Sequence, residues 1–95
     1  MTNVLTILKL VPNDSELDFN SYIKNTIVPK CKEHNIEYIK QDKEPLAFGM
    51  FALVIYIKNE DSEDGADELN AFQEELEGSD DLQAVELQQQ TLIDY

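Results

Sequence analysis

Cys31 and His34 are the side chains of this 95-residue sequence best suited to chemistry, and they lie three positions apart. A nucleophilic thiol needs a base and a third group to orient that base, and a Cys/His metal site needs further ligands at defined spacing. The sequence has one cysteine and one histidine, so neither arrangement is completed and no intrachain disulfide can form. We interpret Cys31 as a packed or partly exposed thiol. We interpret His34, in a loop rich in lysine and glutamate, as an exposed histidine without a role. The sequence predicts no enzyme.

The acidic stretch 60–67 is the next candidate, because carboxylates at alternate positions can bind calcium. If Gly65 is the sixth residue of an EF-hand loop, Glu60, Ser62 and Asp64 fall at ligand positions, but the twelfth position is Ala71 instead of a bidentate glutamate. The motif fails. Adventitious divalent binding is left open beside the simpler interpretation of a solvated turn and helix start, and we predict neither a metal site nor a cofactor.

The loop 44–49, with the sequence Glu-Pro-Leu-Ala-Phe-Gly, precedes the apolar run 51–57. Pro45 fixes the approach of the chain, and Gly49 permits backbone geometry that other residues resist. The loop is therefore suited to present Phe48. The alternative is a core role, since an aromatic beside a strand usually packs inside. Leu46, Met50 and Phe51 are expected either beneath the loop or at its surface.

Charge is segregated along the chain. Residues 1–58 carry seven lysines and seven acidic residues, whereas residues 59–95 carry thirteen acidic residues and no cation, so the net charge of −13 belongs to the second part. Such a surface repels nucleic acid and anionic lipid, and it raises encounter rates with a basic partner; a merely solvated face is the alternative. The chain has no arginine, which excludes bidentate phosphate recognition.

The length predicts a single domain over residues 1–95, which buries roughly 60–65 % of the surface exposed by its unfolded chain. No apolar stretch of about 18 residues is available to cross a membrane, and the N-terminus lacks the charged lead and apolar block of a signal peptide. We expect a cytoplasmic protein.

Alternating and helical patterns predict the elements that must position these residues. The run 4–11 is β-branched and ends at a Pro-Asn-Asp turn, which favours a buried strand. A helix is expected to begin at Asp18 as N-cap, with Leu17 and Tyr22 as a hydrophobic staple, and to close near Val28 because the residue before Pro29 is pushed out of helical geometry. Residues 30–35 are expected to form a loop or frayed turn.

The second half of the chain predicts a half-exposed edge strand over 36–41, a central strand over 51–57 and a charged loop over 58–65. Apolar residues at helical spacing then predict a helix from Ala66 to Leu76, with Gly78 as a left-handed residue at its end. A last strand is expected over 82–93. The order βαββαβ predicts an α+β, ferredoxin-like, two-layer sandwich, in which two helices cover one face of a four-stranded antiparallel sheet with the first and third strands central.

This fold hosts many functions, so the residues must choose among them. An acylphosphatase-type enzyme needs an arginine for its phosphate, and the chain has none. The segment 48–51 partly resembles the stacking aromatics of an RNA-recognition motif, but the consensus is not met. The negative charge of residues 59–95 also disfavours RNA binding.

The proline-led motif Pro45-Leu46-Ala47-Phe48-Gly49, together with the first strand and a helix carrying Gly-Ala-Asp-Glu-Leu at 65–69, resembles the guanine-nucleotide exchange domain of translation elongation factor 1-beta. The resemblance covers nearly the whole chain, in the compact form typical of archaeal relatives or of the eukaryotic C-terminal domain. It implies a monomer that promotes exchange of GDP for GTP on elongation factor 1-alpha by differential binding. It also implies that the loop residues contact this GTPase, with Phe48 inserted, and that neither nucleic acid nor membrane is bound directly.

The C-terminal segment departs from that family. The resemblance implies a basic residue near the C-terminus that disturbs the magnesium and phosphate site of the GTPase, but residues 88–95 read Gln-Gln-Gln-Thr-Leu-Ile-Asp-Tyr. We expect only a C-terminal contact through Gln90, Thr91 and Leu92. A weaker exchanger, a different mechanism and a non-catalytic relative stay open. The alternative function is an acidic ferredoxin-like protein-interaction module without exchange activity.

Overall fold

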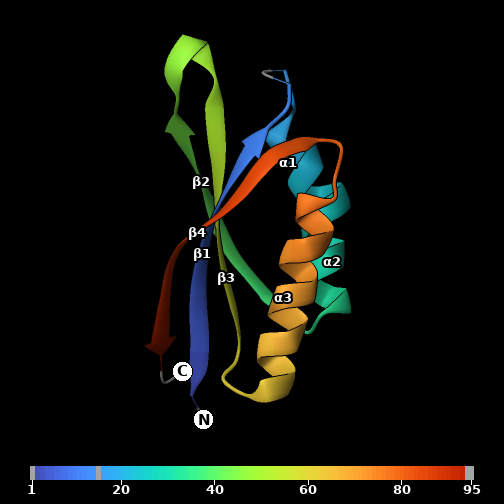
Figure 1. The fold of residues 1–95 in the computed structure, drawn as a ribbon, viewed down its shortest axis with the longest axis vertical. Coiled ribbons are helices and arrows are strands. Elements are labelled where there is room, and N and C mark those ends of the chain that lie inside the picture. The colour runs from blue at the N-terminus through green and yellow to red at the C-terminus, as the bar shows by residue number, and fades with distance from the viewer. Residues whose placement is uncertain (1, 15, 94–95) are drawn as a thin grey trace.

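The computed structural model describes residues 2–14 and 16–93, and for Phe48 it describes the backbone alone. Two layers are visible in Figure 1, with a twisted sheet on one side and the helices packed along one of its faces. The sheet has the strand order β2-β3-β1-β4, and every neighbouring pair is antiparallel. This arrangement confirms the α+β sandwich and the central position of the first and third strands.

The elements follow one another along the chain in the predicted order, with one interruption in the first helix and one short turn. Their bounds are β1 Asn3–Pro12, α1 Phe19–Tyr22, a π-helical segment Ile23–Ile27, α2 Val28–Glu33, β2 Glu37–Pro45, a 3-10 turn Ala47–Gly49, β3 Phe51–Glu60, α3 Glu63–Glu77 and β4 Leu82–Ile93.

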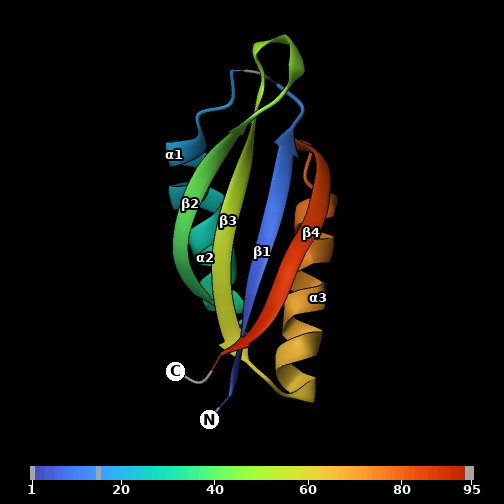
Figure 2. The same cartoon turned by 90° about the vertical axis from the view of Figure 1, so that its left-hand side faces the viewer.

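The core lies between the sheet and the helices. Alternate residues of β1, such as Leu8 and Leu10, are completely buried, and Leu10 pairs with Leu53 across the two central strands. Phe72 and Leu76 of α3 are equally buried, so the helix contributes one apolar face to the same core. The opposite face of the sheet, turned toward the viewer in Figure 2, is not covered by the described helices.

The first helical region is longer than the sequence suggested. Asp18 is the N-cap, as predicted, and its carboxylate accepts hydrogen bonds from the backbone of Asn20 and Ser21. The expectation of closure near Val28 was wrong, because α2 continues through Pro29 to Glu33. The Val28 N–H bonds to the carbonyl of Ile23, five residues back. Since proline removes one N–H and clashes with the carbonyl four residues earlier, this wider turn lets the helix pass it.

Helix α3 also differs from its prediction at both ends. It begins at Glu63 with Ser62 as N-cap, not at Ala66, because β3 extends to Glu60 and leaves no long loop over 58–65. Gly78 has φ −82° and ψ −1°, so the expectation of a left-handed residue there was wrong. Its N–H still bonds to the carbonyl of Glu74 at 3.0 Å, which is the hydrogen bond of a right-handed helix.

The molecule is elongated, with principal extents of 42 × 21 × 18 Å. The β2–β3 connection lies at one end of the long axis, and the start of β1, the end of β4 and the start of α3 lie at the other (Figure 1). Within residues 2–14 and 16–93, no helix is both long enough and apolar enough to span a membrane.

Candidate functional site

The loop between β2 and β3 is closed by two backbone hydrogen bonds. The N–H of Leu46 donates to the carbonyl of Met50 at 2.7 Å, and the N–H of Met50 donates to the carbonyl of Ala47 at 3.3 Å. Pro45 and Phe51 pair at the base of the loop, so the strands continue up to it. A short loop tied in this way holds its tip in one place at the end of a paired ribbon.

The tip of the loop is exposed. Pro45, Ala47 and Gly49 are all open to solvent, and Leu46 and Met50 are partly buried. Gly49 has φ +74°, and a Cβ built on it would meet no atom within 4 Å. Glycine is therefore required there by backbone conformation and not by packing. Phe48 lies in the 3-10 turn, but its side chain is outside the described structure, so its role as an anchor remains a prediction.

An aromatic and cationic cluster at the base of the loop was missed by the sequence reasoning. The ammonium group of Lys43 lies 5.6 Å from the ring centroid of Phe51 and 5.7 Å from that of Phe19. Phe51 is 44 % exposed, so it is a surface residue and not a support packed beneath the loop. The signal was available in part, because Lys43 and Phe51 lie on either side of the loop in the sequence, but the approach of Phe19 from α1 depends on tertiary structure.

The predicted C-terminal contact residues lie together on the last part of β4. Gln90, Thr91 and Leu92 pair with Thr6, Leu5 and Val4 of β1. All three line an open pocket of about 350 Å³ that also includes Asn59 of β3 and Ala66 and Leu69 of α3. Leu92 is 64 % exposed. The pocket therefore offers an apolar edge beside the acidic turn that starts α3.

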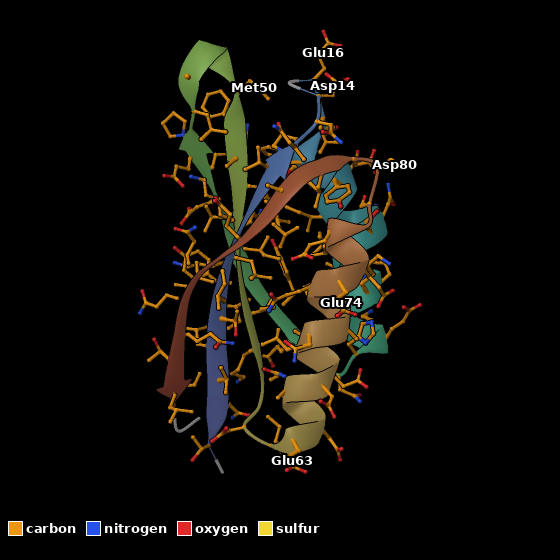
Figure 3. The ribbon with its side chains drawn as sticks, in the orientation of Figure 1. Asp14, Glu16, Met50, Glu63, Glu74 and Asp80 are labelled. Carbon is orange, nitrogen blue, oxygen red and sulfur yellow. The ribbon has the colours of Figure 1, made fainter. Side chains whose placement is uncertain are left out.

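The structure does not bring the two predicted contact regions together. The loop lies at the start of β3, whereas Leu92 and Val4 lie beside the end of β3, where Asn3 pairs with Glu60. Ten residues of β3 separate these ends, a span of about 30 Å at the usual rise of a strand. Figure 3 shows the separation, with Met50 at one end of the molecule and Glu63 at the other.

Of the two states expected for Cys31, packed or partly exposed, the structure shows the packed one. Only 1 % of the residue is exposed, and burial raises the pKa of its thiol to about 12. A thiol that stays protonated at neutral pH is a poor nucleophile, which agrees with a packing role.

The expectation that His34 is exposed was wrong. Its side chain is only 15 % exposed. Its Nδ1 lies 2.8 Å from the Glu68 carboxylate, and its Nε2 contacts the Glu75 carboxylate. Burial alone would lower the pKa of His34, but hydrogen bonds to Glu68 and Glu75 outweigh it and the pKa is raised. Sequence could not reveal this contact, because α3 approaches the end of α2 only in the folded chain.

Comparison with known structures agrees with the observed fold. The C-terminal domain of the MgtC protein from Mycobacterium tuberculosis superposes with a TM-score of 0.65, covering 90 % of this chain and 85 % of that one at 14 % identity. At such low identity the likeness concerns the fold alone.

Comparison with known sequences is more specific. Elongation factor 1-beta of Metallosphaera sedula is 35 % identical over 79 residues, which cover 82 % of this chain and 85 % of the relative. Elongation factor 1-beta of Saccharolobus solfataricus is 33 % identical with the same coverage. Residues 5–93 match the family described as the EF-1 guanine nucleotide exchange domain. This chain, with its exposed β2–β3 loop, therefore belongs to the EF-1 guanine nucleotide exchange domain family.

Proposed function

We propose that this protein is a cytoplasmic translation elongation factor that promotes exchange of GDP for GTP on elongation factor 1-alpha. The observation that carries the proposal is the match of residues 5–93 to the exchange-domain family, which includes the whole β2–β3 loop. In this proposal the loop residues 45–49 contact the GTPase, and the ring of Phe48 inserts into it. The protein acts as a monomer and performs no covalent chemistry.

Exchange by this route depends on differential binding. A protein that binds the nucleotide-free GTPase more tightly than the nucleotide-bound form lowers nucleotide affinity by the same factor. Each tenfold loss of nucleotide affinity requires about 1.4 kcal/mol of such a difference. One aromatic ring buried at an interface supplies roughly 2–3 kcal/mol. A loop aromatic whose pocket exists only in the open GTPase would therefore give a measurable acceleration.

The separation of the two contact regions has a consequence for the partner. If the loop and the segment Gln90–Leu92 both touch the GTPase, the contact must extend along the sheet for about 30 Å, the length of a ten-residue strand. Such an interface is wide enough to join two parts of one large protein. The exchange factor would then act as a rigid spacer that holds these parts at a fixed separation.

One observation favours a second function. Residues 59–95 contain no lysine or arginine, so the end of β4 offers no cation to disturb a bound magnesium ion or phosphate. An acidic interaction module would bind a basic protein through this surface without loosening its nucleotide.

Release of a fluorescent guanine nucleotide from the cognate elongation factor 1-alpha distinguishes the two functions. An exchange factor accelerates release in proportion to its concentration. A binding module forms the complex, as measured by calorimetry, but leaves the release rate unchanged. Absence of both binding and acceleration would contradict both functions. If exchange occurs, its rate in variants of Gln90 and Leu92 will show how much the C-terminal contact contributes.

A further inference from the structure

Glu33, His34 and Glu75 form a compact group of ligand atoms at the contact between α2 and α3. Glu33 is the last residue of α2, His34 follows it, and Glu75 lies on the last turn of α3. One ligand atom from each residue can be chosen so that all three lie within 4.8 Å of one another. A tetrahedral zinc site places its ligand atoms about 3.3 Å apart. Small rotations of the exposed Glu33 and Glu75 side chains would close the remaining difference.

Two of these ligands are already oriented by neighbours. The Nδ1 of His34 lies 2.8 Å from the Glu68 carboxylate, which holds the ring with its Nε2 turned toward Glu75. The other oxygen of Glu75 accepts from the Nζ of Lys30 at 3.1 Å. A histidine that binds a metal almost always donates its second ring N–H to a carboxylate or carbonyl, and carboxylate ligands are themselves hydrogen-bonded. The group therefore has the outer hydrogen bonds of a metal site as well as its donors.

We propose that Glu33, His34 and Glu75 bind a divalent transition-metal ion of the Zn²⁺ class, with His34 bound through Nε2. One imidazole and two carboxylates, with a water in the fourth position, suit zinc and cobalt. Magnesium and calcium are less suitable, because they take oxygen ligands only and need more of them. The ion replaces the contact between His34 and Glu75 and leaves both outer hydrogen bonds in place.

The proposed site would join two helices that are otherwise held by side-chain packing and ion pairs. Its position on the helix layer is separate from the β2–β3 loop and from the pocket beside Leu92, so metal binding is independent of the proposed GTPase contacts. The high negative charge of the chain raises the local concentration of any divalent cation. The test must therefore distinguish a specific site from general attraction.

Zinc binding is measured on the whole protein by competition with a chromophoric chelator, and cobalt binding is measured from its visible absorption. We expect one strong site per chain. His34→Gln should weaken zinc binding by more than about a hundredfold and abolish the cobalt band, and Glu68→Gln, which alters only an outer partner, should weaken it about tenfold. Nitrogen NMR of the histidine ring should show the zinc-dependent shift at Nε2, with Nδ1 still protonated.

Glu74→Gln is the matched control, because it removes one negative charge from the adjacent, exposed position of α3 (Figure 3). It should leave zinc affinity unchanged. Glu33→Gln removes a proposed ligand on an exposed side chain and should weaken zinc binding by more than Glu68→Gln does, without affecting the fold, as checked by circular dichroism. The proposal is overturned if the parent protein binds zinc no better than His34→Gln, if Glu74→Gln loses as much affinity as Glu75→Gln, or if equimolar magnesium displaces the zinc.

Discussion

Gly49 and Gly65 are single residues that shape opposite ends of the molecule for different reasons. Gly49 needs its left-handed backbone, and the space around it is open. Gly65 lies on the first turn of α3, where an added Cβ would stand 2.0 Å from the backbone carbonyl oxygen of Glu60. The carbonyl of Gly65 also accepts from the Asn59 side chain at 2.7 Å. The end of β3 and the start of α3 can approach this closely only because Gly65 has no side chain.

Gly65→Ala should therefore destabilise the fold. Backbone atoms must move to relieve the contact with Glu60, and overpacking of this kind costs about 1–3 kcal/mol of unfolding free energy. Gly78→Ala is the control, because Gly78 is right-handed and the nearest atom to its Cβ is 3.5 Å away. It should be neutral or stabilise by up to about 1 kcal/mol. Urea unfolding of the two variants measures the difference, and equal effects would contradict the steric argument.

Phe48→Ala separates recognition from folding. If Phe48 is an exposed anchor, the change alters the unfolding free energy by less than about 1 kcal/mol and weakens binding to the GTPase by about 2 kcal/mol, roughly thirtyfold. Phe72→Ala provides the comparison, because Phe72 is completely buried and its loss should cost about 3–5 kcal/mol of stability. A strongly destabilised Phe48 variant, or a stable one that binds and exchanges like the parent, would remove Phe48 from the site.

At the scale of elements, sequence patterns were sufficient wherever local chemistry agreed with the tertiary structure. The strand over 82–93 was predicted with its observed bounds, and Asp18 caps its helix as expected. Predictions failed where a distant segment decided the outcome. Pro29 should end a helix by its local preference, yet packing of Ile27 and Cys31 in the core continues it. The partners of His34 lie 34 and 41 positions away, beyond the reach of any local pattern.

The N-cap of α1 can be tested at this scale. Asp18→Ala removes the acceptor for the backbone N–H groups of Asn20 and Ser21, so it should lower the unfolding free energy by about 1 kcal/mol. Asp18→Asn is the matched control, because an asparagine side chain still caps a helix and should lose much less. Thermal unfolding of both variants decides, and a loss of equal size would show that charge, instead of the hydrogen bonds, stabilises this helix start.

At the scale of the whole molecule, acidic side chains are most concentrated on α3. Helix α3 alone carries seven of them, at positions 63, 64, 67, 68, 74, 75 and 77. Lys9 and Lys58 lie next to buried residues of β1 and β3, so the strand alternation turns them toward the face of the sheet that the helices leave open. Each is paired there, with Glu44 and Glu37 respectively. The protein therefore presents a strongly negative helix α3 and a more balanced sheet face.

Association with a basic partner should depend on salt. Exposed charges are screened beyond roughly 10 Å at 0.1 M ionic strength, so the association rate should fall several-fold between about 50 and 200 mM salt. Stopped-flow mixing with the cognate GTPase measures it. A triple variant with Glu63→Gln, Asp67→Asn and Glu74→Gln should start slower and depend less on salt. If the association rate of the parent protein does not change with salt concentration, the acidic half does not steer its encounter with the GTPase.

The π-helical segment Ile23–Ile27 has a consequence for how the first helix winds. Phe19, Ile23, Ile27 and Cys31 all contact the core, and they recur every four residues. In a regular α-helix four residues turn through about 400°, so three such steps would carry Cys31 about 120° around the axis from Phe19. A turn closed over five residues rotates less per residue and cancels part of this surplus. The underwound segment therefore keeps the stripe of buried residues straight, so that one helix can follow the sheet along its length.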